Sequence, residues 1–187
     1  NVLSDATAAL NAIKAGKANA VKLLSSNDLA EVEAAGWTIN ANELDFAGLL
    51  LLDRDGDEAE ALKDVRVHQT LNYAFDREGL LAAMENGNGT VTGQVFPESS
   101  PAYDPALDDY YGYDPEKARE LLAEAGYADG FTLSMPSSAF FGSTLYTLID
   151  QQLADIGVTT EYTDPGSNFI ADLLAPKFPA SYMTLEQ

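Results

Sequence analysis

Three aspartates alternate in one polar stretch of the chain, at Asp53, Asp55 and Asp57. Carboxylates spaced in this way resemble the start of a calcium-binding loop with Asp64 at its far end. An EF-hand loop requires Gly at its sixth position, which is Glu58 here, and Glu at its twelfth, which is Asp64. Because the pattern departs at both positions, we expect a solvated acidic turn and keep Asp53, Asp55 and Asp57 as the candidate calcium ligands.

The motifs of the common catalytic sites are missing from the sequence. The single histidine, His68, falls within a predicted helix, and no serine lies in a Gly-x-Ser-x-Gly turn. There is neither a Gly-x-x-x-x-Gly-Lys loop nor a Gly-x-Gly-x-x-Gly fingerprint after a strand. The absence of cysteine excludes disulfides and thiolate metal sites. We therefore expect that the protein is not an enzyme and binds neither a cofactor nor a metal. The alternative is a hydrolase whose catalytic groups are a pair of carboxylates.

The charge balance is strongly acidic. Lys and Arg total 10 and Asp and Glu total 30, for a formal net charge of -20. Such a surface repels nucleic acid, whose binding proteins carry basic patches, so we expect no nucleic-acid partner. No apolar run approaches the length of about 20 residues that spans a bilayer. The chain begins at Asn1 without a charged-then-apolar leader, so we expect a removed leader or an excised piece.

The first half of the chain predicts short helices and strands around the acidic turn. Residues 46–52 are nearly all apolar, as expected of a strand buried on both faces. A helical region over residues 63–85 is interrupted at Asp76, and the Asn-Gly-Asn-Gly of residues 86–89 predicts a turn. The other predicted elements are helices over residues 4–15 and 26–35, strands over 18–24 and 37–39, and an acidic turn over 53–57.

The second half reads as alternating helices and strands. Residues 92–113 are rich in Pro, Tyr, Asp and Gly and predict a long surface loop, with the tyrosines packing it onto the domain. Asp114 and Pro115 are typical of a helix cap and first helical position. The remaining elements are strands over residues 131–135, 158–162 and 180–185 and helices over 143–156 and 168–174. The strands over 131–135 and 158–162 flank a helix and should be parallel, which favours an α/β class with a mixed β-sheet flanked by helices.

Residues 64–80 closely resemble the signature helix of family 5 bacterial extracellular solute-binding proteins. They read Asp-Val-Arg-Val-His-Gln-Thr-Leu-Asn-Tyr-Ala-Phe-Asp-Arg-Glu-Gly-Leu, with His68 and Thr70 where the family typically has Arg and Ala. Later pieces resemble the family in the same order: residues 92–97, 103–105, 113–127, 129–133 and 151–158. The apolar positions of residues 64–80 should build the core, and the Arg and Asp charges should tie helix ends together.

The resemblance implies one lobe of a two-lobed periplasmic-binding-protein-like fold (type II, cluster C). Residues 1–187 would be a single lobe, the C-terminal ligand-binding lobe, with the missing N-terminal lobe of the same protein across a cleft. The implied function is capture of peptides or similar small solutes for the permease subunits of an ABC importer. The implied location is outside the cytoplasmic membrane, with a lipid anchor in the full-length protein. A calcium-binding module for cell-surface interactions is a further alternative.

The ligand-contacting residues are only weakly marked in the sequence. The resemblance places an acidic ligand contact and a nearby Trp beyond Gln187. Within the chain, the loops at strand ends are the candidates, and we single out Trp37, Met183, Leu185 and Gln187. For Trp37, packing in the core or near a hinge is an equally good interpretation.

Overall fold

The computed structural model describes residues 6–23, 28–40 and 45–186 of the chain. These residues fall into two compact units, which are considered separately below. Unit 1 combines residues 1–43 with 78–90, and unit 2 combines residues 44–77 with 91–187. Parts of several predictions lie outside the described residues: the starts of the helices predicted over residues 4–15 and 26–35, the Leu24 end of the first predicted strand, and the site residue Gln187.

Unit 1 is helical, with α1 (Ala6–Lys14), α2 (Leu29–Ala34) and α4 (Arg77–Glu85). The first two helices end as the sequence predicts, at Gly16 and Gly36, whose φ angles of 65° and 72° suit glycine. Each end is closed by a backbone hydrogen bond, from Lys17 N to Ala12 O and from Trp37 N to Val32 O. The strands predicted over residues 18–24 and 37–39 are wrong for the described residues, which contain no strand there. An extended segment becomes a strand only where a neighbouring strand bonds to its backbone, and none of the described strands bonds to these segments.

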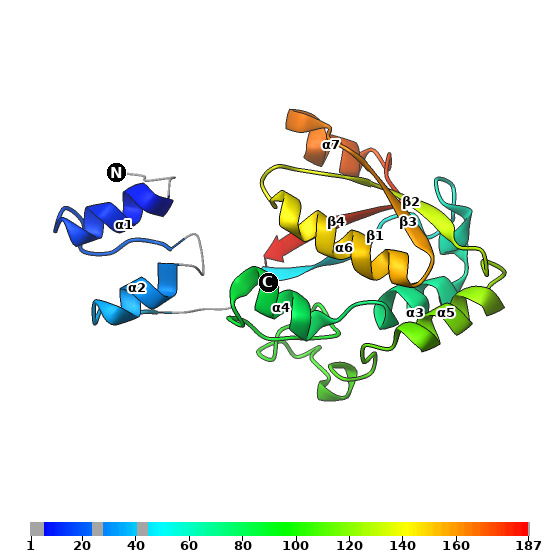
Figure 1. The fold of residues 1–187 in the computed structure, drawn as a ribbon, viewed down its shortest axis with the longest axis horizontal. Coiled ribbons are helices and arrows are strands. Elements are labelled where there is room, and N and C mark those ends of the chain that lie inside the picture. Colours follow the sequence, from blue (N-terminus) through cyan, green and yellow to red (C-terminus); the bar gives the residue numbers. More distant parts are fainter. Residues whose placement is uncertain (1–5, 24–27, 41–44, 187) are drawn as a thin grey trace. The chain divides into compact units, whose positions relative to one another are not determined.

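Unit 2 contains the strands. β1 (Asp45–Leu51) pairs antiparallel with β4 (Ala180–Glu186), and β2 (Phe131–Pro136) pairs in parallel with β3 (Val158–Thr163). Helix α6 (Ser143–Asp155) connects the parallel pair and packs on β3, while β2 lies next to β4 (Figure 1). The parallel pairing and the mixture of strand directions confirm the predicted α/β class.

The remaining elements of unit 2 cover this framework. α3 (Val65–Tyr73) packs against α5 (Pro115–Glu124) and the short 3₁₀ helix η2 (Glu60–Lys63). The predicted helical region breaks as expected, because α3 ends at Tyr73 and the next helix begins at Arg77. Two more 3₁₀ turns, η3 (Pro105–Leu107) and η4 (Gly166–Asn168), and helix α7 (Phe169–Leu174) complete the unit.

The core of unit 2 forms where the apolar stripes of the helices meet the parallel strands. Burial of such side chains stabilises a domain by about 1.5–3 kcal/mol each. Its fully buried large side chains include Leu62, Val67, Leu133, Met135, Leu153, Ile156 and Val158. The prediction that β1 is buried on both faces is wrong, because its residues 46–51 other than Ala47 are only half-buried and Ala47 is exposed. Within unit 2, β1 makes its main contacts with β4.

Candidate functional site

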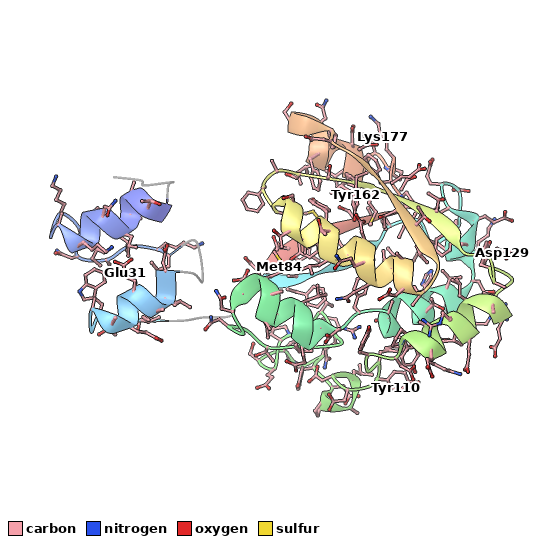
Figure 2. All side chains as sticks on the ribbon, viewed as in Figure 1. Glu31, Met84, Tyr110, Asp129, Tyr162 and Lys177 are labelled. Atoms are coloured by element: carbon pink, nitrogen blue, oxygen red, sulfur yellow. The ribbon has the colours of Figure 1, made fainter. Side chains whose placement is uncertain are left out.

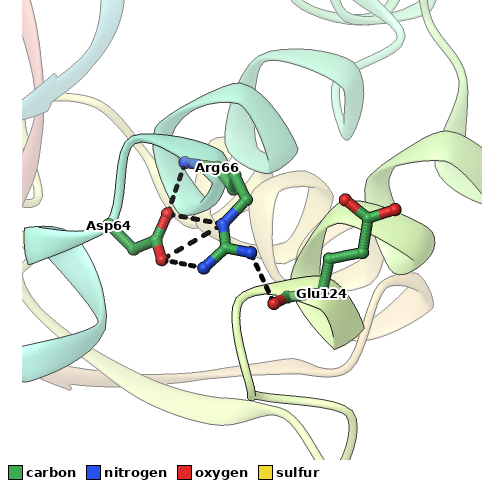
Figure 3. A network of polar contacts seen from close by, with 3 residues as sticks. All are labelled: Asp64, Arg66 and Glu124. Carbon is green, nitrogen blue, oxygen red and sulfur yellow. Dashed lines mark hydrogen bonds and ion pairs between the residues drawn. The ribbon is translucent and has the colours of Figure 1, made fainter.

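The most recognisable segment of the sequence, residues 64–80, holds helices together. The Asp64 carboxylate caps α3 by accepting a hydrogen bond from Arg66 N at 2.9 Å, and it also accepts from the Arg66 side chain (Figure 3). Arg66 in turn donates from Nη1 to the carbonyl oxygen of Glu124, at the end of α5, at 2.6 Å. The side-chain hydrogen bond from Arg66 lowers the pKa of Asp64 to about 2. The predicted role of these charges in tying helix ends is confirmed.

Arg77 performs a similar task at the other end of α3. Its guanidinium donates to the carbonyl oxygens of Tyr111 and Asn72 at 3.0 and 3.1 Å, and to Asn72 Oδ1 at 3.3 Å. Burial lowers the pKa of Arg77. The backbone N–H of Asp114 donates to Tyr73 O, so the chain returns from the long loop at the same place. The side chains of Asp64, Arg66 and Arg77 in this segment are therefore occupied by internal contacts.

The long loop over residues 92–113 is pinned to itself by one carboxylate. Asp108 accepts hydrogen bonds from the side chains of Thr92, Gln94 and Tyr103, and Gln94 is buried. These hydrogen bonds lower the pKa of Asp108, and the bond from Gln94 has the largest effect. The bond between Tyr103 and Asp108 raises the pKa of Tyr103 to about 12. The rings of Tyr110 and Tyr111 also stack edge-to-face, with centroids 4.8 Å apart. The interpretation of the tyrosines as packing residues is confirmed for Tyr103, through its bond to Asp108, and for Tyr111, whose ring packs on Tyr73 with centroids 5.2 Å apart, whereas Tyr110 and Tyr113 are 62% and 49% exposed.

The acidic turn uses its first carboxylate internally. Both Asp53 oxygens accept backbone N–H groups, Oδ1 from Asp57 at 2.9 Å and Oδ2 from Glu58 and Ala59 at 2.8 Å. Partial desolvation raises the pKa of Asp53, but the backbone hydrogen bonds outweigh it and the pKa lies below its ordinary value. Asp55 and Asp57 are exposed. Among the described residues, no group of three or more His, Cys, Asp or Glu side chains is arranged to hold a metal ion.

Two of the predicted ligand contacts lie together on one face of β4. Met183 is opposite Gly48 of β1 and Leu185 is opposite Phe46, so the side chains of Met183, Leu185 and Phe46 project to the same side of the sheet. A Cβ atom placed on Gly48 would lie 2.8 Å from the Phe46 ring, so this ring covers Gly48. Met183 and Leu185 are half-buried. Trp37, also half-buried, belongs to unit 1, and its backbone closes α2.

The structure reveals a further candidate, the loop over residues 137–142 between β2 and α6. Ligands of open α/β sheets bind outside the carboxyl ends of the strands, and this loop follows the carboxyl end of β2. Phe140 is 85% exposed at its tip. The adjacent Phe141 ring packs on Tyr182 of β4 and on Phe169 of α7, with centroids 5.0 and 6.2 Å away. The sequence contained a signal for this site, two adjacent phenylalanines directly after a predicted parallel strand.

Hydrogen bonds hold this loop in a defined conformation. Ser137 N donates to Thr163 O at the end of β3, and Ser138 N donates to the hydroxyl of Tyr146 on α6, both at 2.8 Å. The Tyr146 ring packs edge-to-face on Tyr162 of β3, labelled in Figure 2, with centroids 4.9 Å apart. Burial, and then the hydrogen bond and charge of nearby Asp150, raise the pKa of Tyr162. An exposed aromatic ring on an ordered loop is a pre-formed contact surface.

A shallow cavity of about 460 Å³ lies beside β1. It is lined by Leu49, Leu50, Leu51, Leu52, Arg54 and His68. His68 is half-buried, as predicted for a helical histidine, and one ring nitrogen lies 2.6 Å from the carbonyl oxygen of Leu62. Leu52 on the cavity wall is 37% exposed, and Arg54 and His68 add polar groups to the four leucines.

Comparison with known proteins decides the family. The family described as bacterial extracellular solute-binding proteins, family 5 Middle, matches residues 1–183. The chain belongs to this family. Family members are binding proteins located outside the cytoplasmic membrane. Among the described residues of this member, no helix is both long and apolar enough to cross a membrane.

Individual relatives agree with the family. Heme-binding protein A of Haemophilus influenzae is 43% identical over 74 residues, which are 40% of this chain and 13% of that protein. Glutathione-binding protein GsiB of Salmonella typhimurium is 40% identical over 103 residues, which are 52% of this chain and 19% of that protein. The fold matches the periplasmic binding protein DppA of Helicobacter pylori in complex with the peptide STSA, with a TM-score of 0.80 and 17% identity. That match covers 100% of this chain and 36% of DppA, so the chain spans little more than a third of that protein.

Proposed function

We propose that residues 1–187 form the C-terminal ligand-binding lobe of an extracytoplasmic solute-binding protein, which captures peptides or similar small solutes and delivers them to the permease subunits of an ABC importer. The observation that carries this proposal is the family match over residues 1–183. The fold supports it, since it matches along its whole length a binding protein that holds a peptide. The other lobe and a lipid anchor would belong to the rest of the full-length protein.

The solute would lie between this lobe and the missing N-terminal lobe. Two-lobed proteins hold a ligand by closing both faces on it, so each lobe contributes part of the affinity. On this lobe, Phe140 offers an apolar ring, and the loop that carries it is already ordered by Ser137 and Ser138. An ordered loop loses little conformational entropy on binding. Trp37, Met183, Leu185 and Gln187 remain our other candidate contacts.

Calorimetric titration of the full-length protein with libraries of di- to tetrapeptides tests the function. We expect at least one class of short peptide to bind and to be recovered intact after incubation. A protein that binds no peptide or comparable small solute would refute the proposed function. Cleaved peptide would instead support the carboxylate-pair hydrolase, and a rise in melting temperature with added calcium would support the calcium-binding module.

Substitution of one ring tests the site on this lobe. Phe140→Ala should weaken the binding of the best peptide by about 5- to 30-fold, because truncation of an aromatic contact costs about 1–2 kcal/mol. Phe96→Ala is the matched control, since Phe96 is 47% exposed on the separate 92–113 loop and should leave affinity unchanged. Equal affinities for the Phe140→Ala variant and the unmodified protein would remove this loop from the site.

A further inference from the structure

Two asparagines in the turn after α4 are each followed by glycine. They are Asn86, before Gly87, and Asn88, before Gly89, and all four residues are exposed. Asparagine is thermolabile, because the backbone nitrogen of the next residue can attack its side-chain carbonyl. A following glycine has no side chain to hinder this attack, and it leaves the backbone free to rotate. The sequence makes both asparagines susceptible, so the conformation of the turn decides between them.

The end of α4 restrains Asn86. This residue has a φ angle of 52°, in the left-handed region. The nitrogen that would attack its side chain is that of Gly87, and the Gly87 N–H donates to Leu81 O at 3.2 Å. The bond satisfies one of the last carbonyl groups of the helix. Attack on Asn86 therefore requires that the C-terminal end of α4 opens first.

Among the described residues, one exposed hydrogen bond holds the side chain of Asn88. Its Nδ2 donates to Glu85 O at 2.8 Å, and its backbone N donates to the same oxygen at 2.9 Å. Because the side-chain bond is exposed, water replaces it at little cost. Within the described part of the chain, the N–H of Gly89 makes no hydrogen bond. The nitrogen that attacks Asn88 is thus free to lose its proton while the helix stays intact.

We propose that Asn88 is a site of spontaneous deamidation in the folded protein, and that α4 protects Asn86 from the same reaction. Gly89 N forms a bond to Cγ of Asn88 and gives up its proton to the side-chain amide, while the Cγ–Nδ2 bond breaks and ammonia leaves. Water then opens the resulting cyclic imide at either carbonyl, which leaves aspartate or isoaspartate in place of Asn88. The reaction needs only water, and it does not depend on the solute that the protein binds.

The modification changes the end of α4. It removes the Nδ2 donor to Glu85 O and places a negative charge at a helix C-terminus, which already carries a partial negative charge. The carboxylate of Glu85, in the last turn of the helix, adds to the repulsion. The backbone bonds that close this end, from Gly87 N and Asn88 N, should therefore weaken as the protein ages.

Peptide mapping of the full-length protein by tandem mass spectrometry tests the proposal, with Asn86 as the matched control in the same turn. The protein is incubated at mildly alkaline pH in water labelled with heavy oxygen, so each asparagine takes up label only as it deamidates. In the folded protein, Asn88 should react at least about fivefold faster than Asn86, the ratio that corresponds to one net hydrogen bond. In denaturant, the two sites should react at similar rates. Equal rates in the folded protein, or a difference that denaturant leaves unchanged, would overturn the proposal.

Two variants link the reaction to its site and to the helix end. Asn88→Gln keeps a side-chain amide but would have to form a larger ring, so the fast labelling of the turn should disappear. Asn88→Asp introduces the charge of the product, so the amides of Gly87 and residue 88 should exchange hydrogen faster than in Asn88→Gln. Fast labelling that persists in Asn88→Gln would assign it to another residue and refute the site. Equal exchange in the two variants would refute the effect on α4.

Discussion

Replacement of Arg77 by Met tests whether residues 64–80 act as a scaffold. The change keeps the apolar stem but removes three hydrogen bonds, to the carbonyl oxygens of Tyr111 and Asn72 and to Asn72 Oδ1. Each such bond contributes about 1 kcal/mol net, and partial exposure of the guanidinium reduces their sum to about 2 kcal/mol. For a chain of this length, about 2 kcal/mol corresponds to a fall in melting temperature of about 4–8 °C.

Far-UV circular dichroism is the appropriate assay for the melting temperature. The single tryptophan, Trp37, lies in unit 1, whereas the lost bonds lie in unit 2, so fluorescence would report on the wrong unit. Limited proteolysis provides a second readout, because Arg77 anchors Tyr111 at the end of the 92–113 loop. We expect faster cleavage within this loop and a peptide affinity close to that of the unmodified protein.

Arg119→Met is the control for loss of an arginine. Arg119 is exposed and makes a single bond to Asp155 O at 2.9 Å, so its loss should cost about 0.5 kcal/mol. A difference of 1–2 °C in melting temperature corresponds to about 0.5 kcal/mol for a chain of this length. The scaffold interpretation is refuted if Arg77→Met melts within this difference of Arg119→Met and its 92–113 loop is cleaved no faster. A large loss of peptide affinity with unchanged melting would instead place Arg77 in the binding site.

Three further predictions follow from local chemistry. The pKa of Asp64 falls from 3.8 to about 2 on folding, so its contribution to stability is complete above pH 3.8 and disappears as the pH falls toward 2. The Asp64→Asn variant should not show this loss of stability when its melting temperature is measured at falling pH. Identical acid profiles for the variant and the unmodified protein would contradict the prediction. Gly130→Ala should destabilise the protein by at least twice the roughly 1 kcal/mol expected for Gly166→Ala. Both glycines have positive φ, but only at Gly130 would an added Cβ atom overlap the carbonyl of Gly157. Equal urea midpoints of the two variants would contradict this prediction. Raising the salt concentration from 0.1 to 2 M should raise the melting temperature by several degrees, because salt screens the repulsion among the acidic side chains of a chain with net charge -20. An unchanged melting temperature would show that this repulsion does not limit stability.

Local sequence determined the elements whose ends and faces it encodes. Asp114 and Pro115 predicted the start of α5, and the structure shows the Asp114 carboxylate accepting from Lys117 N at 2.9 Å. Gly16 and Gly36 marked helix ends because only a residue without a side chain adopts their positive φ at little cost. The parallel strands β2 and β3 followed from the strand–helix–strand order, since a helix is the usual connection between parallel neighbours.

Tertiary structure decided whatever depends on a neighbour distant in sequence. Among the described residues, 18–23 and 37–39 have strand-like composition but pair with no strand, and β1 has the composition of a buried strand but pairs only with β4. Two adjacent phenylalanines after a predicted strand mark the 137–142 loop in the sequence, but only the tertiary structure places Phe141 against Tyr182, which lies 41 residues later in the chain. The sequence thus determined the family and the scaffold through residues 64–80, because their contacts are set by helix caps and apolar spacing. Exposure, edge pairing and the grouping of aromatic rings depend on how the strands are placed side by side, and no local pattern encodes that.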